Sequence, residues 1–211
     1  MKIQLPLLIV CLCMVFLNSC SSTPEHEQES TGPTEAAIRE ATLDPEEYLV
    51  PESRYTTSGV ELQKRYRSLM LDLIEDINSL KSHQVREKTV GFYYDQKTKD
   101  RDHLYLGYDL TIYDSPAHLA DSYTNRALKV IRNTLKPLLD RSRNIYPILD
   151  EQPVIGLVLG FYWTHDGKSE SVTAWIDASD LKKYHDRRIT FNECMVRSIY
   201  TGQDNKIIRL L

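Results

Sequence analysis

Residues 154–176 decide the fold, and they read VIGLVLGFYWTHDGKSESVTAWI. Asp166 and Gly167 are residue types that a two-residue hairpin turn favours, because both turn positions take positive φ. The stretch therefore predicts two antiparallel strands with His165 opposite Lys168. Side chains then alternate between the two faces of the sheet, and the mostly apolar face predicts the core. The opposite face carries Gly156, Val158, Gly160, Tyr162, Ser171, Thr173 and Trp175.

A second hairpin is predicted upstream, from residues 89–94 and 104–113. Residues 104–113 show the two-residue period that is typical of a half-buried strand. The face of this hairpin that points away from the core carries Gly91, Tyr93, Tyr105, Gly107, Asp109 and Tyr113. Glycine inside a strand often marks the close approach of another group to the backbone. Tyrosine and tryptophan are enriched at recognition surfaces.

The two hairpins thus place four of the eight glycines on one sheet face, together with four tyrosines and a tryptophan. We interpret this face as a shallow groove suited to a sugar chain, a peptide or a partner protein. The candidate binding residues are Tyr93, Tyr105, Tyr113, Tyr162 and Trp175. Two other interpretations stay open. The tyrosines can reflect strand propensity on a solvated face, or a terminal helix can pack closely over the glycines.

Helices are predicted on both sides of the first hairpin. Ser58 opens a capping box that predicts the start of one helix. The Ser-Pro pair at 115–116 predicts the start of a second helix. Pro137 lies inside the apolar pattern of that second helix, so we expect it to kink or end the helix near Leu135.

Two further helices are predicted after the second hairpin. Residues 177–186 form the first, and a capping box at Thr190 opens a last helix that runs to about Tyr200. Ile189 is alternatively part of a fifth strand. The order α-β-β-α-β-β-α predicts an α+β two-layer sandwich, with an antiparallel sheet of about four strands packed against helices. We expect residues 59–211 to form this single globular domain.

Residues 1–19 are interpreted as a signal peptide. Residues 3–17 are almost wholly apolar, which is too short for a spanning helix but fits a secretory signal. Residues 17–20, Leu-Asn-Ser-Cys, resemble the lipobox of bacterial lipoproteins. This resemblance implies cleavage before Cys20 and acylation of Cys20 with long chains of the palmitate class. It also implies a lipid-anchored protein of the cell envelope, with the outer membrane favoured because Ser21 and not Asp follows Cys20.

Residues 20–58 are predicted to be an acidic, flexible tether. Residues 21–58 hold nine acidic residues against two basic ones, with four prolines and few apolar residues. The whole chain has a net charge of -4, whereas residues 59–211 hold 23 basic and 21 acidic residues. A nucleic-acid partner is therefore not expected, since proteins of that class show a basic footprint.

Catalytic and metal-binding patterns are weak in this sequence. Cys194 is the only cysteine after Cys20, and its helical spacing predicts a buried thiol and not a nucleophile activated by His185. The aspartates of residues 177–186 predict a solvated helix more than an ion site. No nucleotide-binding or hydrolase motif is present. We predict no cofactor and no metal.

The function predicted from these observations is a membrane-anchored binding or assembly module of the envelope. Its partner is expected to be an envelope protein or a wall polymer, held on the face that carries Tyr162 and Trp175. One alternative is an envelope hydrolase with an acid-base site near Asp109, which needs a second titratable group that the strands do not supply. The other alternative is a structural lipoprotein or a surface adhesin.

Overall fold

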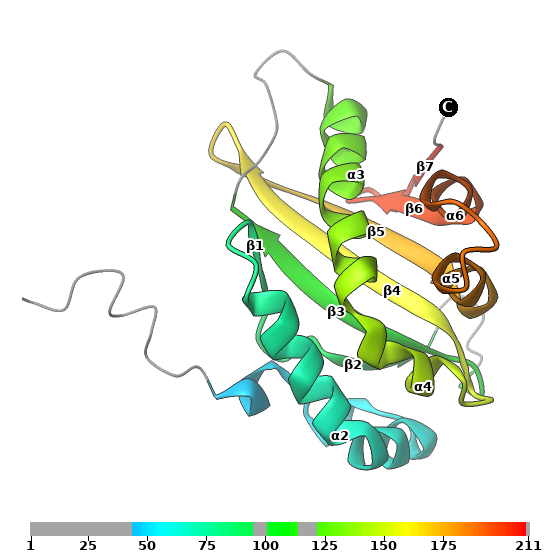
Figure 1. The fold of residues 1–211 in the computed structure, drawn as a ribbon. Helices are drawn as coiled ribbons and strands as arrows, with labels where there is room; N and C mark the ends of the chain where they lie inside the picture. Colours follow the sequence, from blue (N-terminus) through cyan, green and yellow to red (C-terminus); the bar gives the residue numbers. More distant parts are fainter. Residues whose placement is uncertain (1–43, 95–100, 114–121, 210–211) are drawn as a thin grey trace, which may run out of the picture. The chain divides into compact units, whose positions relative to one another are not determined.

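The computed structural model describes residues 44–94, 101–113 and 122–209, which form an α+β fold (Figure 1). The helices in these ranges are α2 (Thr57–Asn78), α3 (Tyr123–Arg141), α4 (Tyr146–Leu149), α5 (Ala178–His185) and α6 (Phe191–Arg197). The strands are β1 (His83–Val85), β2 (Gly91–Tyr94), β3 (Leu104–Ile112), β4 (Val154–His165), β5 (Lys168–Asp177), β6 (Ile199–Gly202) and β7 (Ile207–Ile208). Three 3-10 turns complete them: η1 (Pro45–Tyr48), η2 (Glu52–Arg54) and η3 (Arg143–Ile145). The predicted signal peptide and Cys20 lie outside the described residues.

The seven strands form one mixed, open sheet. Its order is β1-β3-β4-β5-β6-β7, and β2 also pairs with β3. β2–β3 and β4–β5 are antiparallel, but β3 and β4 run parallel to each other. The prediction of an all-antiparallel sheet of about four strands is therefore wrong. The helix α3, which lies between the two hairpins in sequence, provides the crossover connection that a parallel pair requires (Figure 1).

The β4–β5 hairpin has the predicted register. His165 pairs with Lys168, and the pairing continues without a shift as far as Gly156 opposite Asp177. The turn residues Asp166 and Gly167 both have positive φ, 49° and 71°. The two-residue turn chemistry therefore sets which side chains of both strands face the core.

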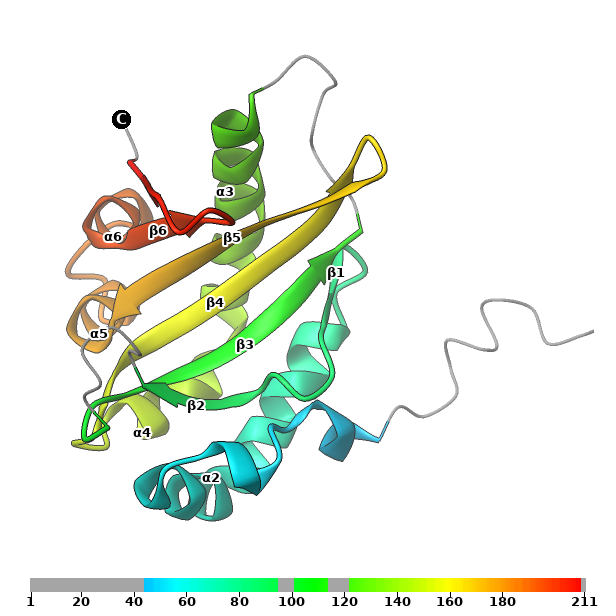
Figure 2. The same ribbon diagram turned by 180° about the vertical axis from the view of Figure 1, so that it is seen from behind.

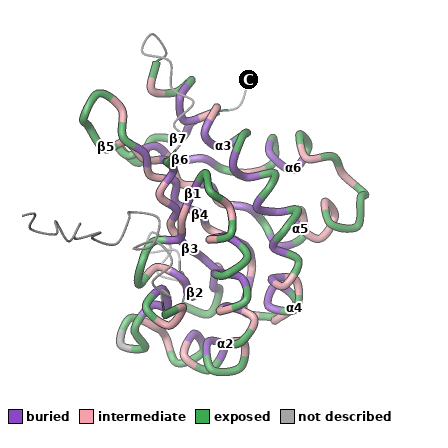
Figure 3. The backbone as a smooth tube through the Cα atoms, turned by 60° about the vertical axis from the view of Figure 1, so that its left-hand side comes forward, coloured by how far each residue is buried: buried purple, intermediate pink, exposed green. Residues whose placement is uncertain are grey.

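The helices and the sheet form two layers. All described helices lie against one face of the sheet, and the view from behind shows no described helix over the other face (Figure 2). Along β4, Leu157, Leu159, Phe161 and Trp163 face the helices and are buried, whereas Val158 and Tyr162 on the other face are partly exposed (Figure 3). The core between the layers includes Met70, Ile74, Leu106, Leu110, Ile131, Leu135, Leu157, Leu159, Phe161 and Ala174.

The folded part begins earlier than the sequence predicted. Tyr48, Leu49 and Val50 are only 2–6% exposed. Leu49 bridges Val90 in parallel orientation, and the backbone N–H of Val50 donates to the carbonyl of Val90 at 2.9 Å. The predicted domain boundary at residue 58 is therefore too late, because a short apolar run inside the acidic stretch pairs with the edge of the sheet.

The starts and ends of the first two long helices differ from the predictions. The N-cap of α2 is Thr56, not Ser58. The predicted start of the second helix at 115–116 lies outside the described residues. α3 continues through Pro137, so the predicted end near Leu135 is wrong. The helix persists because apolar residues on both sides of the proline pack into the core. No helix in the described part of the chain is both long and apolar enough to cross a membrane.

The two C-terminal helices confirm their predicted starts. The Asp177 side chain caps α5, and Thr190 forms a complete capping box with Glu193 at the start of α6. The predicted end of the last helix is wrong, because α6 stops at Arg197 and Tyr200 lies in β6. Tyr200 pairs with Ala174 and is 1% exposed, so burial of its ring against the core favours the strand.

Candidate binding face

We call the sheet surface opposite the helices the open face. Strand pairing places on it the side chains of Tyr93, Tyr105, Asp109, Thr111, Val158, Tyr162, Thr173, Trp175, Ile199, Thr201 and Ile207, with Tyr113 just beyond the end of β3. All five candidate binding residues from the sequence therefore share this face. Four of them are partly buried, and the fifth, Tyr113, is 52% exposed.

The open-face glycines lie beneath tyrosine side chains. The pairs are Gly91 with Tyr55, Gly107 with Tyr93 and Gly156 with Tyr105, while Gly160 lies beneath the Asp109 carboxyl group and the edge of the Tyr162 ring. A Cβ atom on Gly107 would come within 2.7 Å of the Tyr93 ring, and one on Gly156 within 3.0 Å of the Tyr105 ring. The absent side chains let these rings lie close to the backbone.

The role of the open-face glycines therefore differs from the one that the sequence predicts: they make room for side chains of this protein and not for a ligand. The expected groove with a glycine floor does not form over these strands, because tyrosine side chains, and the Asp109 side chain at Gly160, fill that space. The alternative of a helix packed over the glycines is also wrong for the described residues (Figure 2). The result is an aromatic surface supported by the sheet.

One part of the open face is apolar, and we call it the apolar end: Tyr105, Val158, Trp175, Ile199 and Ile207. Tyr105 and Trp175 meet edge to face with ring centroids 5.1 Å apart. The Trp175 Nε1–H donates to the Thr201 hydroxyl at 3.3 Å, which fixes the indole ring. Ile199 and Ile207 are 54% and 67% exposed. Exposed apolar side chains grouped in this way mark interaction surfaces more often than isolated ones do.

A hollow of about 380 Å³ lies elsewhere on the open face, and we call it the Arg86 hollow. Its lining residues are Arg86, Thr111, Ile112, Tyr113, Tyr162, Trp163, Thr164 and Ser169. The volume lies within the range of roughly 300–1,000 Å³ that is usual for small-ligand sites. The Arg86 guanidinium carbon lies 4.2 Å from the centroid of the Tyr162 ring, a cation-π contact. Two of the five predicted binding residues thus line a real concavity.

Asp109 forms a hydrogen bond with Tyr162, one of the residues that line this hollow. Burial raises the pKa of the Asp109 carboxyl above its usual range, while the Arg86 charge and a hydrogen bond with Tyr162 act in the opposite direction. A hydrolase needs a second acid or base within reach of the substrate. The described residues that line the hollow include neither a carboxylate nor a histidine. The acid-base site near Asp109 therefore stays a prediction.

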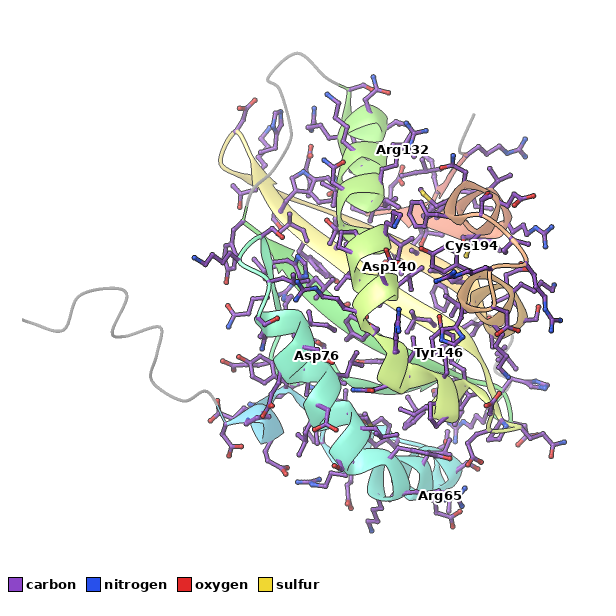
Figure 4. The ribbon with its side chains drawn as sticks, viewed as in Figure 1. Arg65, Asp76, Arg132, Asp140, Tyr146 and Cys194 are labelled. Carbon is purple, nitrogen blue, oxygen red and sulfur yellow. The ribbon has the colours of Figure 1, made fainter. Side chains whose placement is uncertain are left out.

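The Cys194 thiol lies in the helix layer, away from the open face (Figure 4). It is 1% exposed, and burial raises its pKa to about 11. Such a thiol carries almost no thiolate at neutral pH and is a poor nucleophile. His185 instead packs against Tyr146, with ring centroids 4.0 Å apart and the ring planes tilted by 38°. The expected role of Cys194 as a small core residue agrees with this geometry.

The aspartates near the second hairpin have structural roles. Asp177 accepts from the backbone N–H of Ser179 at 2.7 Å, and Asp180 pairs with Lys183 and Arg197. No group of three metal-ligating side chains occurs among residues 44–94, 101–113 and 122–209.

The sequence did not identify Arg86 or Tyr55 as part of the face. Arg86 follows β1, where Gln84 faces the same side as Thr111 of the neighbouring strand. Alternation through Gln84 and Arg86 is the sequence signal that places Arg86 on this face. The strand β1 has only three residues, which are too few to make that alternation recognisable. Tyr55 belongs to the segment that was assigned to the tether. No protein-family model, no curated protein and no solved structure matches this chain.

Proposed function

We propose that this protein is a lipid-anchored module of a bacterial cell envelope that binds a partner on its open face. The observation that carries the proposal is the aromatic surface of Tyr93, Tyr105, Tyr162 and Trp175, over which no described helix packs. In a sheet that is covered on both faces, such rings lie in a core. On the open face they lie beside the exposed side chains of Ile199 and Ile207 instead. The partner is an envelope protein or a wall polymer.

Anchoring at Cys20 supports this function physically. Acyl chains hold a protein at a membrane through about 0.8 kcal/mol for each buried CH₂ group. Confinement at the membrane raises the effective concentration of the open face for a partner in the same compartment. A surface that binds its partner only weakly in free solution is therefore sufficient to hold that partner at the membrane.

The anchor is tested by Cys20→Ala. The variant should lose labelling by a radioactive or clickable fatty acid and should leave the membrane fraction, because the side chain that carries the lipid is gone. Fatty-acid labelling and fractionation of cells that express either form measure this. Cys194→Ala serves as the matched cysteine control and should keep both properties. A Cys20→Ala protein that stays acylated and membrane-bound contradicts the anchor.

The open face is tested by site-specific photo-crosslinking in intact envelopes. A photo-reactive residue at Thr173, in the middle of the open face, should give a discrete adduct. The same residue at Arg132, which is exposed on α3 in the helix layer (Figure 4), is the control and should give little. Trp175→Ala in the Thr173 protein should reduce the adduct, because it removes the largest ring of the apolar end. Equal adducts from both positions, or no effect of Trp175→Ala, contradict the proposed binding face.

A further inference from the structure

The guanidinium of Arg86 is held in place without using its hydrogen-bond donors. It stacks on the Tyr162 ring at 4.2 Å, and no described side chain forms an ion pair or a hydrogen bond with it. Asp109 acts on it only through the longer-range attraction between their charges. Five N–H donors of a planar cation are thus available at the Arg86 hollow.

The loop that carries Arg86 is clamped to the neighbouring strand. The Arg86 N–H donates to the Asp109 carbonyl at 2.8 Å. The Thr89 hydroxyl donates to the Arg86 carbonyl at 2.7 Å and accepts from the Asp109 N–H at 3.1 Å. These three bonds fix the backbone beneath the guanidinium, so the cation loses little further freedom when it binds an anion.

The hollow is also lined by the ring of Tyr113, whose position is fixed by hydrogen bonds. The Tyr113 hydroxyl donates to the Gln84 Oε1 atom, and the Gln84 Nε2 atom donates to the Tyr48 hydroxyl at 3.2 Å. Tyr48 is buried, so the chain of bonds ties an exposed ring to the interior. An exposed ring held in this way offers a flat apolar surface with little rotamer entropy to lose.

The remaining polar groups in the lining are neutral hydroxyls, those of Thr111, Thr164 and Ser169, in addition to that of Tyr162. Arg86 is the only cation among the described residues that line the hollow. One planar cation matches one carboxylate through two parallel hydrogen bonds. Phosphate sites usually add backbone N–H groups or further cations, and the described residues of this lining include no second cation. A sugar ring carries several hydroxyl groups that pair with neutral hydroxyls of this kind, whereas an acidic peptide carries few.

We propose that the Arg86 hollow binds an acidic sugar unit of a polysaccharide, with the sugar carboxylate on Arg86, the ring against Tyr113 and its hydroxyls on the neutral side chains. This inference rests on the proposed function and names the chemistry of the partner. The neighbouring sugar units of the polysaccharide then continue across the open face and contact the aromatic side chains beyond Tyr162.

The test is titration of the full-length protein, purified in detergent, with two trisaccharides of matched length. Trigalacturonate is acidic and maltotriose is neutral. Calorimetry or ligand-observed NMR should show binding of trigalacturonate that is about tenfold or more tighter than that of maltotriose. Arg86→Ala should weaken trigalacturonate binding by about tenfold or more. Arg132→Ala, the matched control in the helix layer, should not change it.

Asp109→Asn gives a readout that a purely structural role of Arg86 would not produce. It removes a negative charge near the guanidinium and keeps an oxygen acceptor for Tyr162, so trigalacturonate should bind more tightly than to the unmodified protein. Thermal melting of each variant confirms that it is folded. Arg86→Lys keeps the charge without the planar guanidinium, so its affinity for trigalacturonate should lie between those of the unmodified protein and Arg86→Ala.

Several results would overturn this inference. They are the absence of trigalacturonate binding, equal binding of maltotriose, unchanged binding by Arg86→Ala, or equal binding of a triglutamate peptide. The last result would show recognition of a carboxylate chain and not of a sugar. The Thr173 adduct separates this failure from failure of the proposed function, because it reports a partner on the open face whatever its chemistry.

Discussion

His83 is a single residue whose burial predicts a pH dependence. It is 3% exposed, its Nδ1 atom lies 3.0 Å from the Ser82 hydroxyl, and its Nε2 atom has no partner among the described residues. Burial, and to a smaller extent the charge of Arg141, lower the pKa of His83 below its usual value. The folded state therefore disfavours the charged imidazolium that the unfolded chain accepts freely.

The sign of the effect follows from this lowered pKa. Above the unfolded-state pKa of about 6.5, both states are neutral and the contribution of His83 to stability is complete. As the pH falls through 6.5 towards the folded-state pKa, the unfolded state binds the proton first and the free energy of unfolding decreases.

Urea unfolding at pH 7.5 and at pH 5.5 measures this effect. The unmodified protein should lose more stability between these two conditions than His83→Gln, which cannot take up the proton. Both proteins share every other titratable group, so the comparison isolates His83. An equal loss in both proteins contradicts the assignment of the pH dependence to this buried ring.

At the scale of the strands, local chemistry predicted pairing well where the turn was short. The Asp166-Gly167 turn and the two-residue period placed Tyr162 and Trp175 on the face where the structure has them. The parallel pairing of β3 with β4 was not predictable in the same way, because it depends on where α3 returns the chain and not on local spacing. β6 was missed because residues 191–200 continue an apolar pattern that is compatible with a helix.

The same scale explains what the glycine pattern did and did not predict. Glycine in a strand correctly indicated the close approach of another group, but the sequence could not say which group. The structure assigns that group mostly to neighbouring tyrosines, which lie diagonally across the strands or on a preceding segment, as Tyr93 and Tyr55 do, and at Gly160 to Asp109 of the paired strand. Diagonal contacts of this kind depend on register and ring rotamers, and neither is written in the local sequence.

Gly107→Ala tests the support of a ring by its glycine. The new Cβ atom would lie 2.5 Å from the Val158 Cγ1 atom and 2.7 Å from the Tyr93 ring, so we expect a loss of about 1–3 kcal/mol in the free energy of unfolding. In the background of Tyr93→Ala the same substitution should cost less, because part of the clash is gone. Denaturant unfolding of the single and double variants measures the coupling. Strictly additive losses would show that the ring and the glycine are independent.

For the whole molecule, the arrangement of two layers gives the two sheet faces different roles. The helices bury most of one face, including Trp163, which is 2% exposed. The other face keeps its second tryptophan, Trp175, partly exposed beside Ile199. This division was predicted from the alternation in residues 154–176, whereas the contribution of residues 44–56 to the fold was not, because those residues are short apolar runs within an acidic stretch.

The accessibility of Trp175 in the full-length protein tests this account most directly. Trp163→Phe leaves Trp175 as the only tryptophan, and Trp175→Phe leaves only Trp163. Acrylamide quenching of fluorescence should be several-fold more efficient for Trp175 than for Trp163, since one indole lies on the open face and the other in the core. If Trp175 is as protected as Trp163, another part of the chain covers the face, and the proposed binding surface does not exist.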